Sequence, residues 1–131
     1  MSSIVEGYYS ELGEPLLDLP LHVRDETFLT LTVVVDTGFN RGLLIFKSEA
    51  EQAELPPVRR VSADRMRLAD GTVHPITPTF GYVRWLGGLQ EIEVAVVRAD
   101  RGERDRCLIG MEFLRGTDIL LGQEAFAIRR S

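Results

Sequence analysis

The chain has 131 residues, of which 44% are hydrophobic and 27% are charged, and its net charge is −5. This length and composition predict a single globular domain over residues 1–131. The acidic balance and the lack of a long Lys/Arg run disfavour a nucleic-acid binder. No apolar run approaches the ~20 residues of a membrane-spanning helix, so no membrane association is expected.

Two further features bear on location. Cys107 has no second cysteine with which to form an internal disulfide, which is typical of a reducing compartment. The first residues include Glu6 and lack the basic start and apolar core of a signal peptide. We therefore expect a cytoplasmic protein.

The first half of the chain has mostly the period-two pattern of β-strands. An edge strand is expected first, then a strand that becomes fully apolar just before Asp36, then a short apolar strand. Ser48 and Glu51 form a capping box, which predicts a short helix ended by Pro56 and Pro57. The strands are expected at residues 17–23, 29–35 and 43–46.

Hairpin signals dominate the second half. Asp70-Gly71 lies between the extended runs of "RMRLADGTVHPI", the strongest short-range cue for a hairpin. Further hairpins are expected at Gly87-Gly88 and at Gly122. About six or seven short strands with little helix predict an all-β barrel or sandwich. The later elements are expected at 82–86, 92–96, 108–110, 111–114 (a helical turn), 119–121 and 125–128.

Asp36 stands at the end of the apolar strand that "VVVDTGFN" contains. A carboxylate is costly to desolvate at the end of a buried strand. Either the strand stops in an ordinary turn, in which the aspartate caps its own backbone, or the carboxylate is held there for chemistry.

The order of motifs carries a resemblance. Asp36-Thr37-Gly38 follows an apolar strand, the Asp70-Gly71 hairpin comes next, and Leu108-Ile109-Gly110 follows near the end. This pattern resembles the retropepsin-like (clan AA) aspartic proteases, in particular a group of small single-domain prokaryotic members. The resemblance implies an all-β closed barrel with a flap hairpin and one or two short helices.

The resemblance also implies a function, which is aspartic endopeptidase activity without cofactor or metal. Two nearby carboxylates can share one proton, so that one acts as general base toward water and the other as general acid. Because the chain supplies a single Asp-Thr-Gly, each subunit of a C2 homodimer would contribute one Asp36. The substrate would be an extended peptide or an unfolded protein.

Roles for the other motif residues follow from the same resemblance. Thr37 would hydrogen-bond across the dimer axis, and Gly38 would let the backbone approach and donate its N–H towards the carboxylates. The run Leu108, Ile109 and Gly110 would pack behind the Asp36 loop. The flap tip, which would close over a peptide and bind it as a strand, comprises Ala69, Asp70, Gly71 and Thr72.

Several alternatives remain open from the residues. Phe39 stands where viral retropepsins have a small residue and could narrow the cleft, which favours a catalytically idle, dimeric peptide-binding module or a scaffold as the alternative function. Asp70 could favour a basic substrate side chain, although a turn role is the stronger interpretation. His22 and His74 have no metal-ligand spacing, and Cys107 is expected to be an inert core residue.

Overall fold

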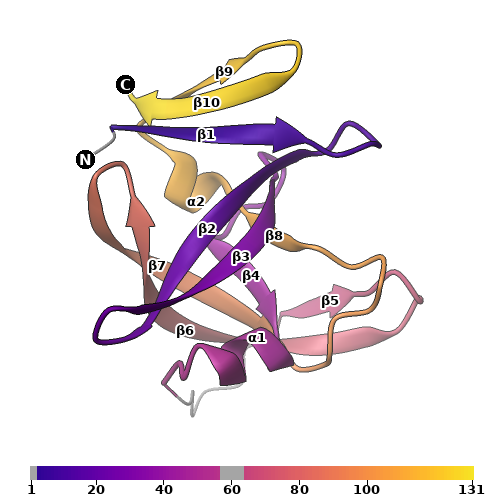
Figure 1. Ribbon diagram of the computed structural model, residues 1–131. Coiled ribbons are helices and arrows are strands. Elements are labelled where there is room, and N and C mark those ends of the chain that lie inside the picture. The colour runs from indigo at the N-terminus through magenta and orange to yellow at the C-terminus, as the bar shows by residue number, and fades with distance from the viewer. Residues whose placement is uncertain (1–2, 57–63) are drawn as a thin grey trace.

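The computed structural model describes residues 3–56 and 64–131 (Figure 1). Two short helices in this part of the chain are α1 (Lys47–Gln52) and α2 (Met111–Leu114). The strands are β1 (Ile4–Tyr9), β2 (Pro15–Arg24), β3 (Thr27–Val35), β4 (Leu43–Phe46), β5 (Arg65–Arg67), β6 (Val73–Trp85), β7 (Gly88–Val97), β8 (Cys107–Ile109), β9 (Thr117–Leu121) and β10 (Ala125–Arg130).

Six strands form a closed barrel in the order β6-β7-β4-β8-β3-β2. The ring closes where Leu21 of β2 pairs with Val83 of β6. Strand β4 is buried at all four positions, because it lies between β7 and β8 in the middle of the sheet. The predicted all-β closed barrel with one or two short helices is therefore confirmed.

Two pieces extend the barrel. Strand β1 pairs with the start of β2 on one side and with β10 on the other, and β9 forms the outer edge. The chain's two ends thus lie side by side, with Ile4 opposite Arg129 (Figure 1). At another edge, β5 pairs with the beginning of β6 to form the flap hairpin.

The capping box predicted at Ser48 is wrong. Helix α1 begins at Lys47 with Phe46 as its N-cap, and the Glu49 carboxylate accepts the Phe46 N–H at 3.1 Å. Ser48 lies inside the helix, where its hydroxyl accepts a hydrogen bond from the Gln52 side chain. The helix ends at Gln52, before Pro56, and Pro57 lies outside the described residues.

The predicted hairpins are present, with two differences. The turn between β6 and β7 consists of Leu86 and Gly87, one residue earlier than expected, since Trp85 pairs with Gly88. Strand β6 is continuous over 13 residues rather than divided in two. Pro78 is tolerated inside it because, among the described residues, β7 is the one strand that pairs with β6 at that point.

Candidate active site

Asp36 follows β3 directly, and its backbone and side chain are both held. Its N–H donates to the carbonyl oxygen of Ile109 at 2.9 Å, and its own carbonyl accepts the Phe39 N–H at 3.1 Å. The carboxylate oxygen Oδ1 accepts the Gly38 N–H at 2.9 Å. Asp36 therefore caps its own turn, and this same bond fixes the direction of a half-buried carboxylate.

The segment Leu108–Gly110 lies directly behind this loop. Strand β8 runs parallel to β3, with Val35 opposite Ile109, and antiparallel to β4. Beyond β8, the Gly110 N–H donates to the Gly42 carbonyl and the Met111 N–H donates to the Phe39 carbonyl, both at 2.8 Å. Three backbone hydrogen bonds thus join the loop of residues 36–42 to the end of β8 and the two residues after it.

Gly110 is packed tightly against the backbone of the Asp36 loop. A Cβ atom at position 110 would lie 2.4 Å from the Arg41 carbonyl oxygen and 2.5 Å from that of Phe39. The ring of Phe39 is also close, since its Cδ2 atom would be 2.6 Å from the same Cβ. A side chain at position 110 would therefore push the Asp36 loop away from β8.

Arg41 is a residue of this loop that sequence reasoning missed. Its Nε atom lies 3.0 Å from Glu93 of β7 and its Nη1 atom 2.5 Å from Asp64, the residue before the flap strand β5. The Arg41 side chain is 22% exposed. No motif could have revealed these pairs, because both partners are distant in sequence and belong to different elements.

The predicted flap residues form the tip of the β5–β6 hairpin, and all four are exposed. The Asp70 carboxylate accepts the Thr72 hydroxyl at 2.6 Å and the Thr72 N–H at 2.9 Å. These two bonds, the hydroxyl's first, hold the pKa of the Asp70 carboxyl below its usual value. Gly71 has φ +88°, which suits a glycine. This geometry agrees with a turn role for Asp70.

The structure does not bring the flap tip onto Asp36. Among the described residues, no hydrogen bond joins the tip to the loop 36–42. Thr37 and Gly38 are exposed on the same loop, and within the described chain the Thr37 hydroxyl has no hydrogen-bond partner. The tip of the Asp36 loop, at Thr37 and Gly38, is therefore exposed in the single chain.

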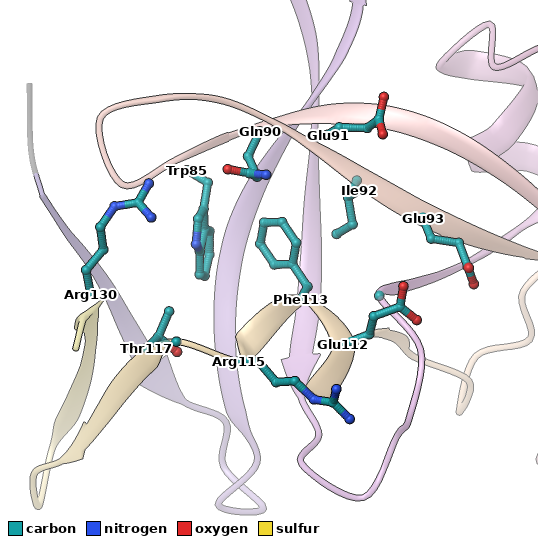
Figure 2. Close-up of a pocket in the computed structure, with 12 residues that line it drawn as sticks. Trp85, Gln90, Glu91, Ile92, Glu93, Glu112, Phe113, Arg115, Thr117 and Arg130 are labelled. Carbon is teal, nitrogen blue, oxygen red and sulfur yellow. The ribbon is translucent and has the colours of Figure 1, made fainter.

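A distinct cavity of about 350 Å³ lies between β7 and α2 (Figure 2). The rings of Trp85 and Phe113 meet edge to face inside it, 4.9 Å apart, and Arg130 approaches beside Trp85. Asp36 does not line this cavity. Gly42 is the residue of the loop 36–42 that lines this cavity, so the Asp36 carboxylate itself lies outside it.

The two histidines and the cysteine make ordinary structural contacts. His22 bonds the Asp25 carbonyl, and His74 bonds the Thr72 hydroxyl. Burial raises the pKa of the Cys107 thiol to about 12, with the neighbouring Glu49 carboxylate adding to the effect. In residues 3–56 and 64–131 there is no group of three or more His, Cys, Asp or Glu side chains that could hold a metal ion. No helix of this part of the chain is long and apolar enough to cross a membrane.

A closed six-stranded barrel, with Asp-Thr-Gly after one strand and a glycine-ended strand packed behind it, defines a retropepsin-like protein. The aspartyl protease family profile matches residues 19–113, so the chain belongs to that family. Comparison with curated protein sequences gives no match. The predicted resemblance is therefore confirmed at the level of family.

One solved structure supports the fold. The crystal structure of a retropepsin-like aspartic protease from Rickettsia conorii is similar to this chain with a TM-score of 0.67 at 16% sequence identity. The similarity covers 97% of this chain and 90% of that one. At this identity the likeness establishes the retropepsin-like fold, and family membership supports a peptidase.

Proposed function

We propose that the protein is a homodimeric aspartic endopeptidase that hydrolyses peptide bonds without a cofactor. The observation that carries the proposal is the Asp36 carboxylate, oriented by the Gly38 N–H on a loop that β8 holds from behind. The chain has one Asp-Thr-Gly, so a dyad needs a second copy related by a two-fold axis. The exposed position of Thr37 and Gly38, next to the half-buried Asp36, is compatible with such an axis.

The mechanism uses two carboxylates that share one proton. Two like charges at close range disfavour full ionisation, so one Asp36 stays protonated while the other is charged. A water molecule attacks the peptide carbonyl while the charged carboxylate takes a proton from that water. The protonated carboxyl gives its proton to the amide nitrogen, which leaves as the amine. The Gly38 N–H donates a hydrogen bond to Oδ1 of each Asp36, which leaves Oδ2 for water or substrate.

The substrate in this proposal is an extended peptide or an unfolded protein that lies between the dyad and the flap. The flap hairpin would add it as a further strand and donate backbone N–H groups from Ala69–Thr72. We also propose that residues 1–131 act as a single domain in the cytoplasm, where the free thiol of Cys107 would remain reduced.

Phe39 is the residue that favours the alternative, a dimeric peptide-binding module without activity. Phe39 is partly buried and packs against the hydrophobic core, with its ring beside Gly110. Because the ring packs into its own chain, it leaves the peptidase as the better supported function.

The experiment that separates the two functions is cleavage of a diverse peptide library between about pH 4 and 7, the range in which a coupled dyad holds one proton. Products are identified by mass spectrometry for wild type and for Asp36→Asn, and sedimentation establishes the dimer in each sample. Wild-type products that disappear in Asp36→Asn support the peptidase. A confirmed dimer that binds peptides equally well in both forms, and cleaves none, supports the module.

A further inference from the structure

The flap tip is hydrogen-bonded to the loop that joins β7 to β8. The N–H of Ala69 donates to Oδ1 of Asp105 at 2.8 Å, although the two residues are 36 positions apart. Figure 1 shows the flap hairpin extending outward beside this loop. The contact therefore joins the flap hairpin, which the proposed function has closing over substrate, to the loop between β7 and β8.

Asp105 is itself held in place as an acceptor. Its second carboxylate oxygen, Oδ2, accepts the Gly102 N–H at 3.0 Å, and its own N–H donates to the Gly102 carbonyl at 3.1 Å. A Cβ atom at position 102 would lie 2.8 Å from Oδ2, so glycine permits this tight turn. One oxygen of Asp105 therefore orders its own loop while the other binds the flap.

The tip that Asp105 binds is a compact turn. The Gly71 N–H donates to the Leu68 carbonyl at 2.9 Å, and the Leu68 N–H donates to the Thr72 carbonyl at 2.8 Å. Leu68 is buried in the core, whereas the following tip residues are exposed. The Ala69 N–H is consequently the tip donor that points to another element rather than into the turn.

We propose that Asp105 is a positioning residue that holds the flap tip against the β7–β8 loop until a peptide is bound. The proposal rests on the function above, in which the tip donates its N–H groups to substrate. While Ala69 bonds Asp105, its N–H is not free for a peptide carbonyl. A carboxylate is a stronger acceptor than a neutral carbonyl, so flap closure must replace a strong bond by a weaker one.

Four other charged side chains line the hollow between the tip and this loop: Asp70, Asp100, Glu103 and Arg104. None of them is hydrogen-bonded to the Ala69 N–H, which has Asp105 as its acceptor. Asp70 is engaged with Thr72. Glu103 therefore offers a matched control: it lies in the same loop and carries the same charge, but makes no side-chain bond to the flap.

The test uses the full chain carrying Asp36→Asn, so that the result does not depend on activity. Nuclear magnetic resonance measures the exchange of the Ala69 amide and the heteronuclear NOE of Gly71 and Thr72. We expect Asp105→Ala to speed Ala69 exchange by about tenfold and to lower the NOE at the tip. Glu103→Ala should change neither quantity.

A second variant tests the other partner, in case Asp105→Ala disturbs its own loop. Ala69→Pro removes the N–H donor and leaves the Asp105–Gly102 turn intact. Proline suits this place, because Ala69 is the second residue of the turn that the Leu68–Gly71 bond closes. The tip NOE should fall as in Asp105→Ala, with an unchanged thermal midpoint.

Tip order that stays at the parent value in both variants, or that falls equally in Glu103→Ala, would overturn the proposal. In a chain that retains Asp36, Asp105→Ala should lower KM and leave kcat unchanged, since closure no longer competes with the carboxylate. If Asp105→Ala and Ala69→Pro lose tip order but the chain that retains Asp36 cleaves no peptide, the flap contact is supported and the peptidase is rejected. Unchanged tip order with Asp36-dependent cleavage would reject the contact's role alone.

Discussion

The Asp36 N–H and the Ile109 carbonyl are joined by a hydrogen bond of 2.9 Å, which ties the candidate catalytic residue to the last residue of strand β8. This bond extends the parallel pairing of β3 with β8 by one step beyond Val35. This bond holds the backbone of Asp36 against β8, while the Gly38 N–H directs its carboxylate. The packing of β8 should therefore control the site as well as the stability of the barrel.

Gly110→Ala tests that dependence. The new methyl group would lie within 2.6 Å of two carbonyl oxygens and the Phe39 ring, so the loop or β8 must shift. We expect the free energy of unfolding to fall by about 1–3 kcal/mol, the usual cost of overpacking. Urea denaturation followed by circular dichroism measures the change.

Gly88→Ala is the matched control for this substitution. A Cβ at position 88 has no heavy atom within 4 Å, and Gly88 does not have a positive φ. Its effect should stay within about 0.5 kcal/mol. Equal losses for the two variants would show that close packing behind the Asp36 loop is not the cause.

The features that local chemistry dictates could be predicted from the sequence. The Asp70-Gly71 turn and the strand before Asp36 are examples, because the turn residues and the apolar run that indicate them are visible within each segment. The start of α1 could not, since Phe46 has no capping side chain and Glu49 alone completes the cap. Ser48 is the nearest residue of a usual capping type, which is why the sequence pattern predicts the cap there instead of at Phe46.

Contacts between distant segments were beyond prediction for a different reason. Arg41, Asp64 and Glu93 are ordinary surface residue types in sequence, and the barrel topology alone brings them together. Strand β1 was missed because its ladder with β10 joins the two ends of the chain. Such pairings need a three-dimensional register that periodicity does not contain.

The Arg41–Glu93 pair should be worth more than an exposed ion pair. Its side chains are 22% and 26% exposed, whereas those of Arg24 and Glu54 are 71% and 49% exposed. A double-mutant cycle with Arg41→Met and Glu93→Gln should give a coupling energy of about 1 kcal/mol. The same cycle at Arg24 and Glu54 should give no more than about 0.5 kcal/mol. Similar couplings at both sites would contradict the role of partial burial.

Cys107 should make stability fall at high pH. Burial raises the pKa of its thiol from 9.0 to about 12, so above pH 9 the unfolded chain loses a proton that the folded chain keeps. Stability from this group is present below pH 9 and is lost as the pH rises towards 12. At pH 10, wild type should lose about 1 kcal/mol more than Cys107→Ala relative to pH 7. Parallel pH profiles of the two proteins would exclude this effect.

Thr37→Val should weaken the dimer without weakening the folded chain. Thr37 is exposed, and within the described residues its hydroxyl has no partner, so its removal leaves no intrachain donor unsatisfied. In the proposed dimer each hydroxyl bonds across the two-fold axis, and its loss occurs twice per interface. We expect the dimer dissociation constant from analytical ultracentrifugation to rise by about tenfold or more, while Thr37→Ser stays near wild type. Thr30→Val, at an exposed threonine on β3, controls for the change of side chain. If Thr37→Val and Thr30→Val have the same dissociation constant, the dimer axis lies away from the Asp36 loop. The two Asp36 carboxylates would then not meet, and the proposed mechanism would be excluded.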